Sequence, residues 1–133
     1  MIYTKTEKAR IETLLTVFRE FISTHHYFDI GYAEKIGYIH IHLDNDQEIL
    51  DCMAMRNYSD VLLVLFEEVS DDIRNERVRN GDESYCLYPS EVEAIKNFLG
   101  PIFEALPNKE DQEYCRFKLD DYLREYLMGS NVQ

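Results

Sequence analysis

The sequence contains no tryptophan, and its longest apolar run is only six residues, at positions 61–66. A membrane-spanning helix needs about 20 apolar residues, so we expect no transmembrane segment. The three cysteines, Cys52, Cys86 and Cys115, are odd in number and form no CxxC pair. That pattern is typical of reduced, buried thiols and excludes a disulfide framework or a zinc knuckle. We therefore expect a cytoplasmic protein.

Local catalytic and targeting motifs are absent as well. The five glycines are scattered and form no phosphate-binding loop, and no serine stands in a GxSxG turn. Residues 1–12 are charged and helical in character from the start, unlike a secretory signal. The sequence therefore favours a non-enzymatic protein, although a catalytic group assembled from distant segments would leave no local motif.

The composition that is present predicts one folded domain over residues 1–133. Apolar residues make up 45% of the chain, which argues against disorder. A chain of this length buries enough surface to fold without a disulfide, a structural metal or a cofactor, and we expect none of these. Ten tyrosines outnumber seven phenylalanines, so many rings should lie at the rim of the core with their hydroxyls hydrogen-bonded.

Negative charge is concentrated in one part of the chain. The formal net charge is −12, yet residues 1–42 carry equal numbers of acidic and basic residues. Residues 43–72 carry nine acidic residues against Arg56 alone, a net charge of −8. Such a surface repels nucleic-acid phosphates and anionic lipids, so we expect no direct nucleic-acid binding and no membrane binding.

An N-terminal helix is predicted by a capping box and an apolar stripe. Thr4 and Glu7 have the spacing at which each side chain satisfies a free backbone N–H at a helix start. The stripe recurs with a period of about 3.6 residues and consists of Ile11, Leu14, Leu15, Phe18 and Ile22. Residues 23–26 lack the stripe and should end the helix.

Three strands should follow, because polar and apolar residues alternate in residues 28–32 and 38–43. We expect Ile39, Ile41 and Leu43 to face the core and the intervening Tyr38, His40 and His42 to face solvent. Residues 48–55 are also apolar enough for a strand, although a short helix is the alternative. Short connections favour a three-stranded antiparallel meander.

Three further helices are predicted after the strands. The first should start near Ser59 and end at residues 79–82, and the second should open with a Ser90–Glu93 capping box. Pro101 should kink that second helix, and Gly129 should stop the last one. The fold class is therefore α+β, in the order α-β-β-β-α-α-α. A small three-stranded antiparallel sheet packs with an N-terminal helix and a C-terminal group of helices.

His40, His42 and Asp44 form one candidate metal site. Alternate residues of a strand point the same way, about 7 Å apart, and two imidazoles with a carboxylate suit zinc or ferrous iron. A small metal-dependent enzyme is therefore one functional hypothesis. A solvent-facing strand that happens to carry two histidines is the simpler interpretation of the same pattern.

The predicted helix that starts near Ser59 is rich in acidic residues and is the stronger functional lead. At about 100° per residue, the side opposite its apolar core stripe should carry Val64, Glu67, Glu68 and Asp71, with Asp72 on its flank. An apolar anchor rimmed by carboxylates suits a basic protein partner, whereas the simpler interpretation is a solvated helix end. We therefore expect a small acidic binding or regulatory protein, one version of which imitates the charge of a nucleic acid. Self-association through Val61, Leu63 and Val64, giving a homodimer, is a third hypothesis.

Overall fold

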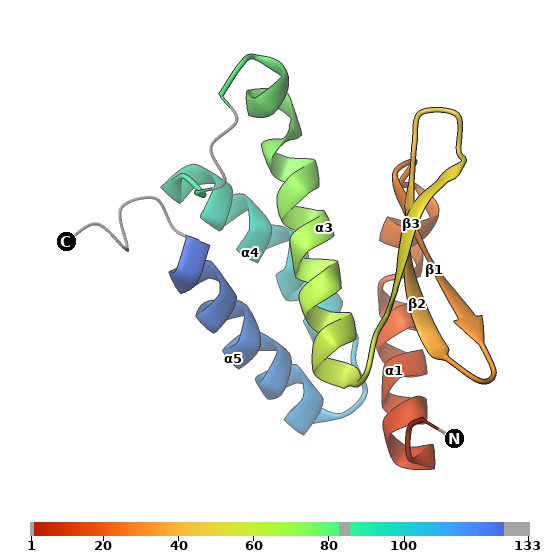
Figure 1. Cartoon of the computed structure of the whole chain (residues 1–133). Helices are drawn as coiled ribbons and strands as arrows, with labels where there is room; N and C mark the ends of the chain where they lie inside the picture. Colours follow the sequence, from red (N-terminus) through yellow and green to blue (C-terminus); the bar gives the residue numbers. More distant parts are fainter. Residues whose placement is uncertain (1, 83–85, 127–133) are drawn as a thin grey trace. The chain divides into compact units, whose positions relative to one another are not determined.

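The structure is a computed structural model that describes residues 2–82 and 86–126, and it has the α+β fold predicted from the sequence (Figure 1). The order of helices and strands is the predicted one, except that the first helix is divided in two. The elements are α1 (Lys5–Val17), α2 (Arg19–Ser23), β1 (Phe28–Ala33), β2 (Gly37–Leu43), β3 (Ile49–Ala54), α3 (Tyr58–Arg79), α4 (Pro89–Glu104) and α5 (Lys109–Tyr126). The predicted stop at Gly129 lies outside the described residues.

The chain forms two compact units, Met1–Val64 and Leu65–Gln133, and the single domain stays a prediction. Nothing in the composition marks this boundary, because it falls inside the continuous helix α3 and no glycine or proline lies near it. Within the described residues, no helix is both long and apolar enough to cross a membrane.

The N-terminal helix begins as predicted and ends earlier. Thr4 Oγ1 accepts a hydrogen bond from the Glu7 backbone N–H at 3.0 Å, which is one half of the predicted capping box. The Glu7 carboxylate instead accepts from the backbone N–H of Tyr58, at 3.2 Å. Thr16 Oγ1 donates to the Glu12 carbonyl at 2.8 Å, a contact that bends helices, and α1 ends one residue later. The chain then resumes as the separate short helix α2.

The three strands form an antiparallel sheet in the order β1-β2-β3, and the third segment is a strand rather than a helix. A bulge interrupts the pairing of β2 with β3 next to His42 and Leu43. Gly37 begins β2 with a φ of +96°, a conformation that L side chains rarely adopt. Figure 1 shows the three strands side by side.

The predicted orientation of β2 is wrong. Tyr38 and His40 are buried, whereas Ile39 and Ile41 are only half-buried. The reason is that α1 offers partners to a tyrosine: the Tyr38 hydroxyl donates to Glu12 at 2.9 Å, and burial together with this bond raises the pKa of Tyr38. Tyrosine and histidine each combine an apolar ring with a polar tip, so they fill a core position once the tip has a partner.

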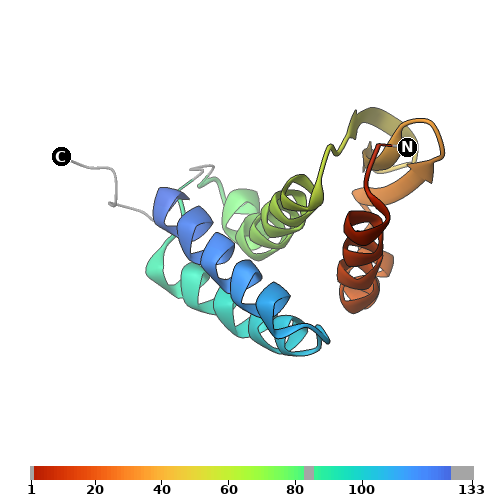
Figure 2. The same cartoon turned by 90° about the horizontal axis from the view of Figure 1, so that it is seen from below.

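The helices of the second unit pack around aromatic side chains. The Phe66 ring lies 6.1 Å from that of Phe103 and 5.7 Å from that of Tyr122, which joins α3, α4 and α5. Figure 2 shows α4 and α5 running side by side. Apolar side chains of α4 and α5, including Leu99 and Leu119, are buried, whereas Tyr126 at the end of α5 is 37% exposed.

The helix starts differ from the predicted ones. Asn57, not Ser59, accepts the backbone N–H of Asp60 at the start of α3, at 2.8 Å. At the start of α4, the Glu91 carboxylate accepts from the Tyr88 backbone N–H at 2.9 Å, so the Ser90–Glu93 capping box is wrong by two residues. Proline is favoured at the first helical position, which places the start at residue 89. The helix then continues through Pro101 to residue 104.

The cysteines are free thiols, but their predicted burial holds for one of the three. Cys115 is fully buried in α5, whereas Cys52 on β3 and Cys86 before α4 are exposed. Cys115 belongs to the apolar stripe of its helix, and Cys52 lies on the edge strand β3, all of whose residues are exposed.

Candidate functional site

The two strand histidines lie together, and a different carboxylate joins them. The rings of His40 and His42 are 4.3 Å apart between centroids, and His42 Nδ1 lies 2.6 Å from Asp51 Oδ1. The register pairs His42 directly with Asp51 across the β2–β3 ladder. Asp44 instead closes the turn, where its Oδ1 accepts the backbone N–H groups of residues 46 and 48, each at 2.9 Å. Sequence spacing along one strand cannot reveal a partner that the neighbouring strand supplies.

Three of the five predicted partner-binding residues on α3 are exposed. Glu67, Asp71 and Asp72 face solvent, but Val64 is 7% exposed and Glu68 is 8% exposed. Their predicted outward orientation is wrong, because α3 buries residues 64–66 and 68–70 without a gap in either run. Consecutive helical residues are about 100° apart, so these runs cover more than half of the helix surface.

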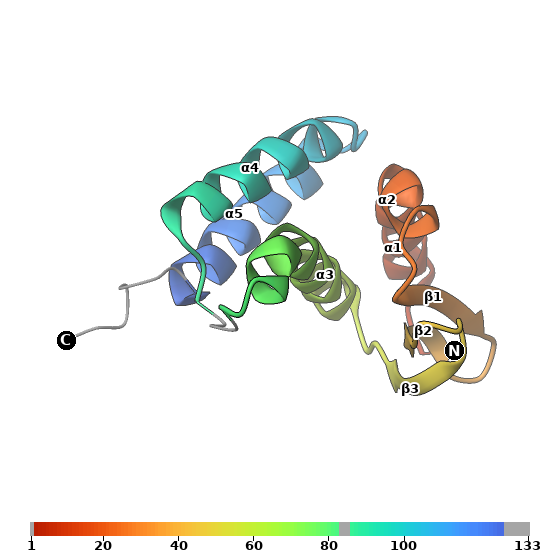
Figure 3. The same ribbon diagram turned by 90° about the horizontal axis from the view of Figure 1, so that it is seen from above.

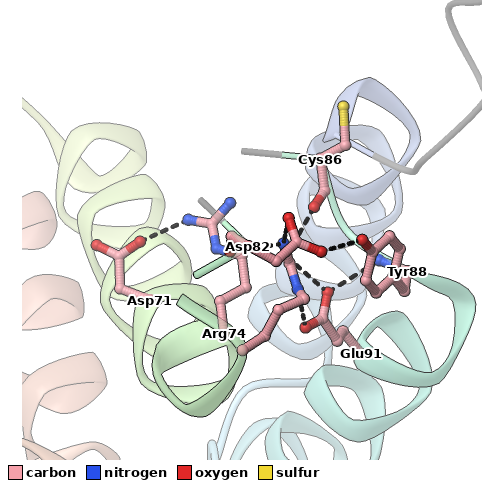
Figure 4. A network of polar contacts seen from close by, with 7 residues as sticks. Asp71, Arg74, Asp82, Cys86, Tyr88 and Glu91 are labelled. Carbon is pink, nitrogen blue, oxygen red and sulfur yellow. Dashed lines mark hydrogen bonds and ion pairs between the residues drawn. The ribbon is translucent and has the colours of Figure 1, made fainter. Parts of the chain in front are cut away.

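Other contacts further reduce the surfaces predicted on α3. Asp71 accepts a hydrogen bond from Arg74 at 2.5 Å, so its charge is partly neutralised (Figure 4). Val61, proposed for self-association, is fully buried, and only Leu63 of that trio is exposed, at 38%. The role of the α3 residues in partner binding stays a prediction. Exposure supports it only for Glu67, Asp71 and Asp72.

A polar network centred on Arg77 connects α3 to the start of α4. Figure 4 shows its labelled members Asp82, Cys86, Tyr88 and Glu91. Arg77 makes a two-pronged ion pair with Glu91, at 2.8 and 3.0 Å, and donates to the Cys86 carbonyl at 2.9 Å. It also pairs with Asp82 at 3.2 Å and lies over the ring of Tyr88. The Tyr88 hydroxyl donates to Asp82, which raises the pKa of Tyr88. This network fastens the segment between the two helices and is best interpreted as structural.

Within the acidic residues 43–72, the most exposed apolar side chains lie on β3. All six residues of this strand are exposed, and Ile49, Leu50 and Met53 are 63%, 65% and 59% exposed. Folded monomers rarely leave a contiguous group of large apolar side chains in water, and such groups mark interaction sites. The sequence carried a sign of this exposure that our prediction missed. Residues 49–54 include apolar residues at both odd and even positions, which face opposite sides of the sheet. An edge strand cannot bury the apolar side chains of both sides.

Carboxylates lie in this strand and in the turn before it, with no lysine or arginine among them. Asp46, Glu48 and Asp51 are exposed, and no lysine or arginine occurs between Lys35 and Arg56. We call residues 37–54, which comprise β2, its turn and β3, the acidic hairpin. Its apolar strand and its exposed carboxylates form one continuous stretch of chain.

The outer face of the sheet adds apolar surface to the acidic hairpin. Helices α1 and α2 lie on one side of the sheet (Figure 3), where Tyr38 and His40 are buried. Ile39 and Ile41 point to the other side, where the register places them beside Ala54 and Cys52. Ile41 also reaches over β1, since a Cβ added at Gly31 would lie 3.2 Å from its Cδ1.

Comparisons of this chain with protein-family models, with curated proteins and with solved structures find no match. Its function therefore has to be inferred from its own geometry and charge.

Proposed function

We propose that this chain is a binding protein that engages a basic protein partner through the acidic hairpin. The observation that carries the proposal is the exposure of every residue of β3 within a segment that has no lysine or arginine. Apolar side chains supply contact area in protein interfaces, while complementary charge speeds association and selects the partner. The exposed α3 carboxylates Glu67, Asp71 and Asp72 provide a second predicted acidic surface.

A narrower form of the proposal concerns the type of partner. The exposed carboxylates of the acidic hairpin, Asp46, Glu48 and Asp51, suit a protein whose basic surface otherwise binds nucleic acid. In that form, double-stranded DNA and this chain compete for the same partner, and simultaneous binding of both would contradict it. We also propose a cytoplasmic location, which the free thiols of Cys52, Cys86 and Cys115 support.

Neutralising the acidic hairpin should weaken binding of a basic probe, which we choose as a nine-residue peptide of alternating lysine and valine with blocked ends. The triple variant combines Asp46→Asn, Glu48→Gln and Asp51→Asn. Exposed ion pairs contribute about 0.2–1 kcal/mol each, so affinity should fall about tenfold, with a weaker dependence on salt. Isothermal titration at several salt concentrations measures both quantities.

The matched control removes the same charge elsewhere. It combines three exposed positions of α4 and α5, Glu93→Gln, Glu104→Gln and Glu113→Gln. The control should bind the peptide nearly as tightly as the unaltered chain. Equal losses in the two triple variants would show that only net charge matters and would remove the acidic hairpin as the site.

A second candidate function, a small metal-dependent enzyme, is favoured by the contact between His42 and Asp51. Metal-binding histidines are commonly oriented by a carboxylate at their other ring nitrogen, and His40 lies beside His42. Protein purified without chelator should then contain about one equivalent of zinc or iron, and His42→Ala should remove it. Elemental analysis checks this, and a metal-free unaltered chain would exclude the candidate.

A further inference from the structure

We infer that the partner supplies an extended basic segment, which pairs with β3 as a fourth strand of the sheet. This inference rests on the proposed function and specifies how the partner is held. Strand addition to an open sheet edge is a recurrent mode of peptide recognition, in which backbone hydrogen bonds supply affinity and alternate side chains supply specificity.

The backbone of β3 is open to such pairing. The sheet order is β1-β2-β3, so among the described strands one edge of β3 has no neighbour. The Met55 N–H donates to the Tyr38 carbonyl at 2.9 Å, which makes these two residues a hydrogen-bonded pair. Bonded and non-bonded pairs alternate along an antiparallel ladder. The N–H and C=O groups of Cys52 and Ala54 therefore point away from β2, toward the open edge.

The side chains of β3 indicate which residues an added strand should carry. Cys52 and Ala54 are small and lie on the outer face beside Ile39 and Ile41, so large apolar residues fit opposite them. Asp51 is on the other face of the strand, and its side chain is 70% exposed. Directly opposed side chains in a sheet are about 4.5–5.5 Å apart at Cβ, within reach of an ion pair. The fitting segment therefore alternates large apolar residues with lysine or arginine.

Charge argues against a second copy of this chain as the occupant. Two copies paired through β3 would bring the carboxylates at positions 46, 48 and 51 of both acidic hairpins together. Like charges on neighbouring strands destabilise a sheet, and no lysine or arginine within residues 36–55 would offset them. A basic segment of another protein satisfies the same edge with opposite charge.

The first test changes the backbone of the probe and leaves its charge alone. The lysine–valine peptide is compared with a version methylated at its four central peptide nitrogens. Methylation removes hydrogen-bond donors, so affinity for the unaltered chain should fall about tenfold, because each bond contributes about 0.5–1.5 kcal/mol. Equal affinity would overturn strand addition while the proposed function stands. Failure of both peptides to bind would overturn both proposals.

The second test changes the edge of the protein. Cys52→Pro removes an N–H that faces away from β2, so the ladder within the sheet is preserved, and proline is tolerated at such edge positions. The control, Cys52→Val, keeps the N–H. The proline variant should bind the unmethylated peptide about tenfold more weakly than the valine variant. Equal binding by the two variants would overturn the inference. It would also be overturned if light scattering showed a dimer of this chain that Cys52→Pro dissociates and Cys52→Val does not, because a second copy would then occupy the edge.

Discussion

Replacing Gly37 by alanine is expected to destabilise the N-terminal unit by about 3–5 kcal/mol, a large part of the stability of a typical domain. A Cβ at this position would lie 2.5 Å from the Tyr3 hydroxyl oxygen. That hydroxyl is buried, donates to the Met55 carbonyl at 2.6 Å and accepts from the Tyr38 N–H at 2.9 Å. Displacing Tyr3 leaves buried groups unsatisfied, at about 1–3 kcal/mol each, and the positive φ adds about 1–2 kcal/mol. Urea unfolding of the full chain measures the loss.

Gly81 provides a matched control for the backbone part of this effect. Its φ is +99°, close to that of Gly37, and a Cβ there would meet nothing within 4 Å. Gly81→Ala should therefore cost only the conformational strain, about 1–2 kcal/mol. If the two variants lost equal stability, the contact between Gly37 and Tyr3 would not matter.

This contact also bears on binding, because Tyr3 connects the start of β2 to the end of β3. Met55 follows β3 directly, and Tyr38 is the second residue of β2. The hydroxyl of Tyr3 therefore holds the open end of the acidic hairpin in place. Rigid binding elements lose less conformational entropy on association, so under the proposed strand addition the same contact would favour binding to β3.

Replacing Arg77 by leucine is expected to destabilise the C-terminal unit by about 3 kcal/mol. The side chains of Arg77 and Glu91 are each 12% exposed, so removing the cation leaves a nearly buried carboxylate without its counter-charge. The substitution also removes the bond to the Cys86 carbonyl. Arg77→Lys is the control. It keeps the charge but cannot make the two-pronged contact, so its loss should be intermediate.

The effect of Arg77→Leu should depend on pH in a defined direction. Burial raises the pKa of Glu91, but hydrogen bonds from Arg77 and from the Tyr88 backbone outweigh it and hold the pKa below its ordinary value of 4.5. Such a group stabilises the fold above its unfolded pKa, and the contribution is lost as pH falls through the folded pKa. The unaltered chain should exceed Arg77→Leu in stability by the full amount at neutral pH and by less below about pH 4.5. A constant difference would contradict this assignment.

Helices and strands could be predicted well because hydrophobic periodicity determines them locally. Ile11 and Leu14 of the N-terminal stripe are buried, and the two segments in which polar and apolar residues alternate form β1 and β2. The orientation of β2 could not be predicted in the same way. Alternation shows that Tyr38 and Ile39 face opposite sides, but which side is buried depends on the partner that Glu12 supplies from α1.

The candidate site was less predictable, because it depends on pairing between segments and on what stays uncovered. The concentration of charge in residues 43–72 was visible in the sequence. The role of Asp51 beside His42 required the strand register, and the burial of Val64 and Glu68 required the packing of α3. The open edge of β3 is a property of the strand order, which places β3 last in the sheet.

Amide hydrogen exchange of β3, measured by NMR during titration with the lysine–valine peptide, tests the central claim most directly. Strand addition predicts that the amides of Cys52 and Ala54 become protected as the peptide saturates the chain, because their N–H groups enter new hydrogen bonds. Amides at the exposed face of α5, such as that of Glu113, should keep their exchange rates and serve as the internal control. Unchanged exchange at Cys52 and Ala54 in the saturated complex would contradict the account.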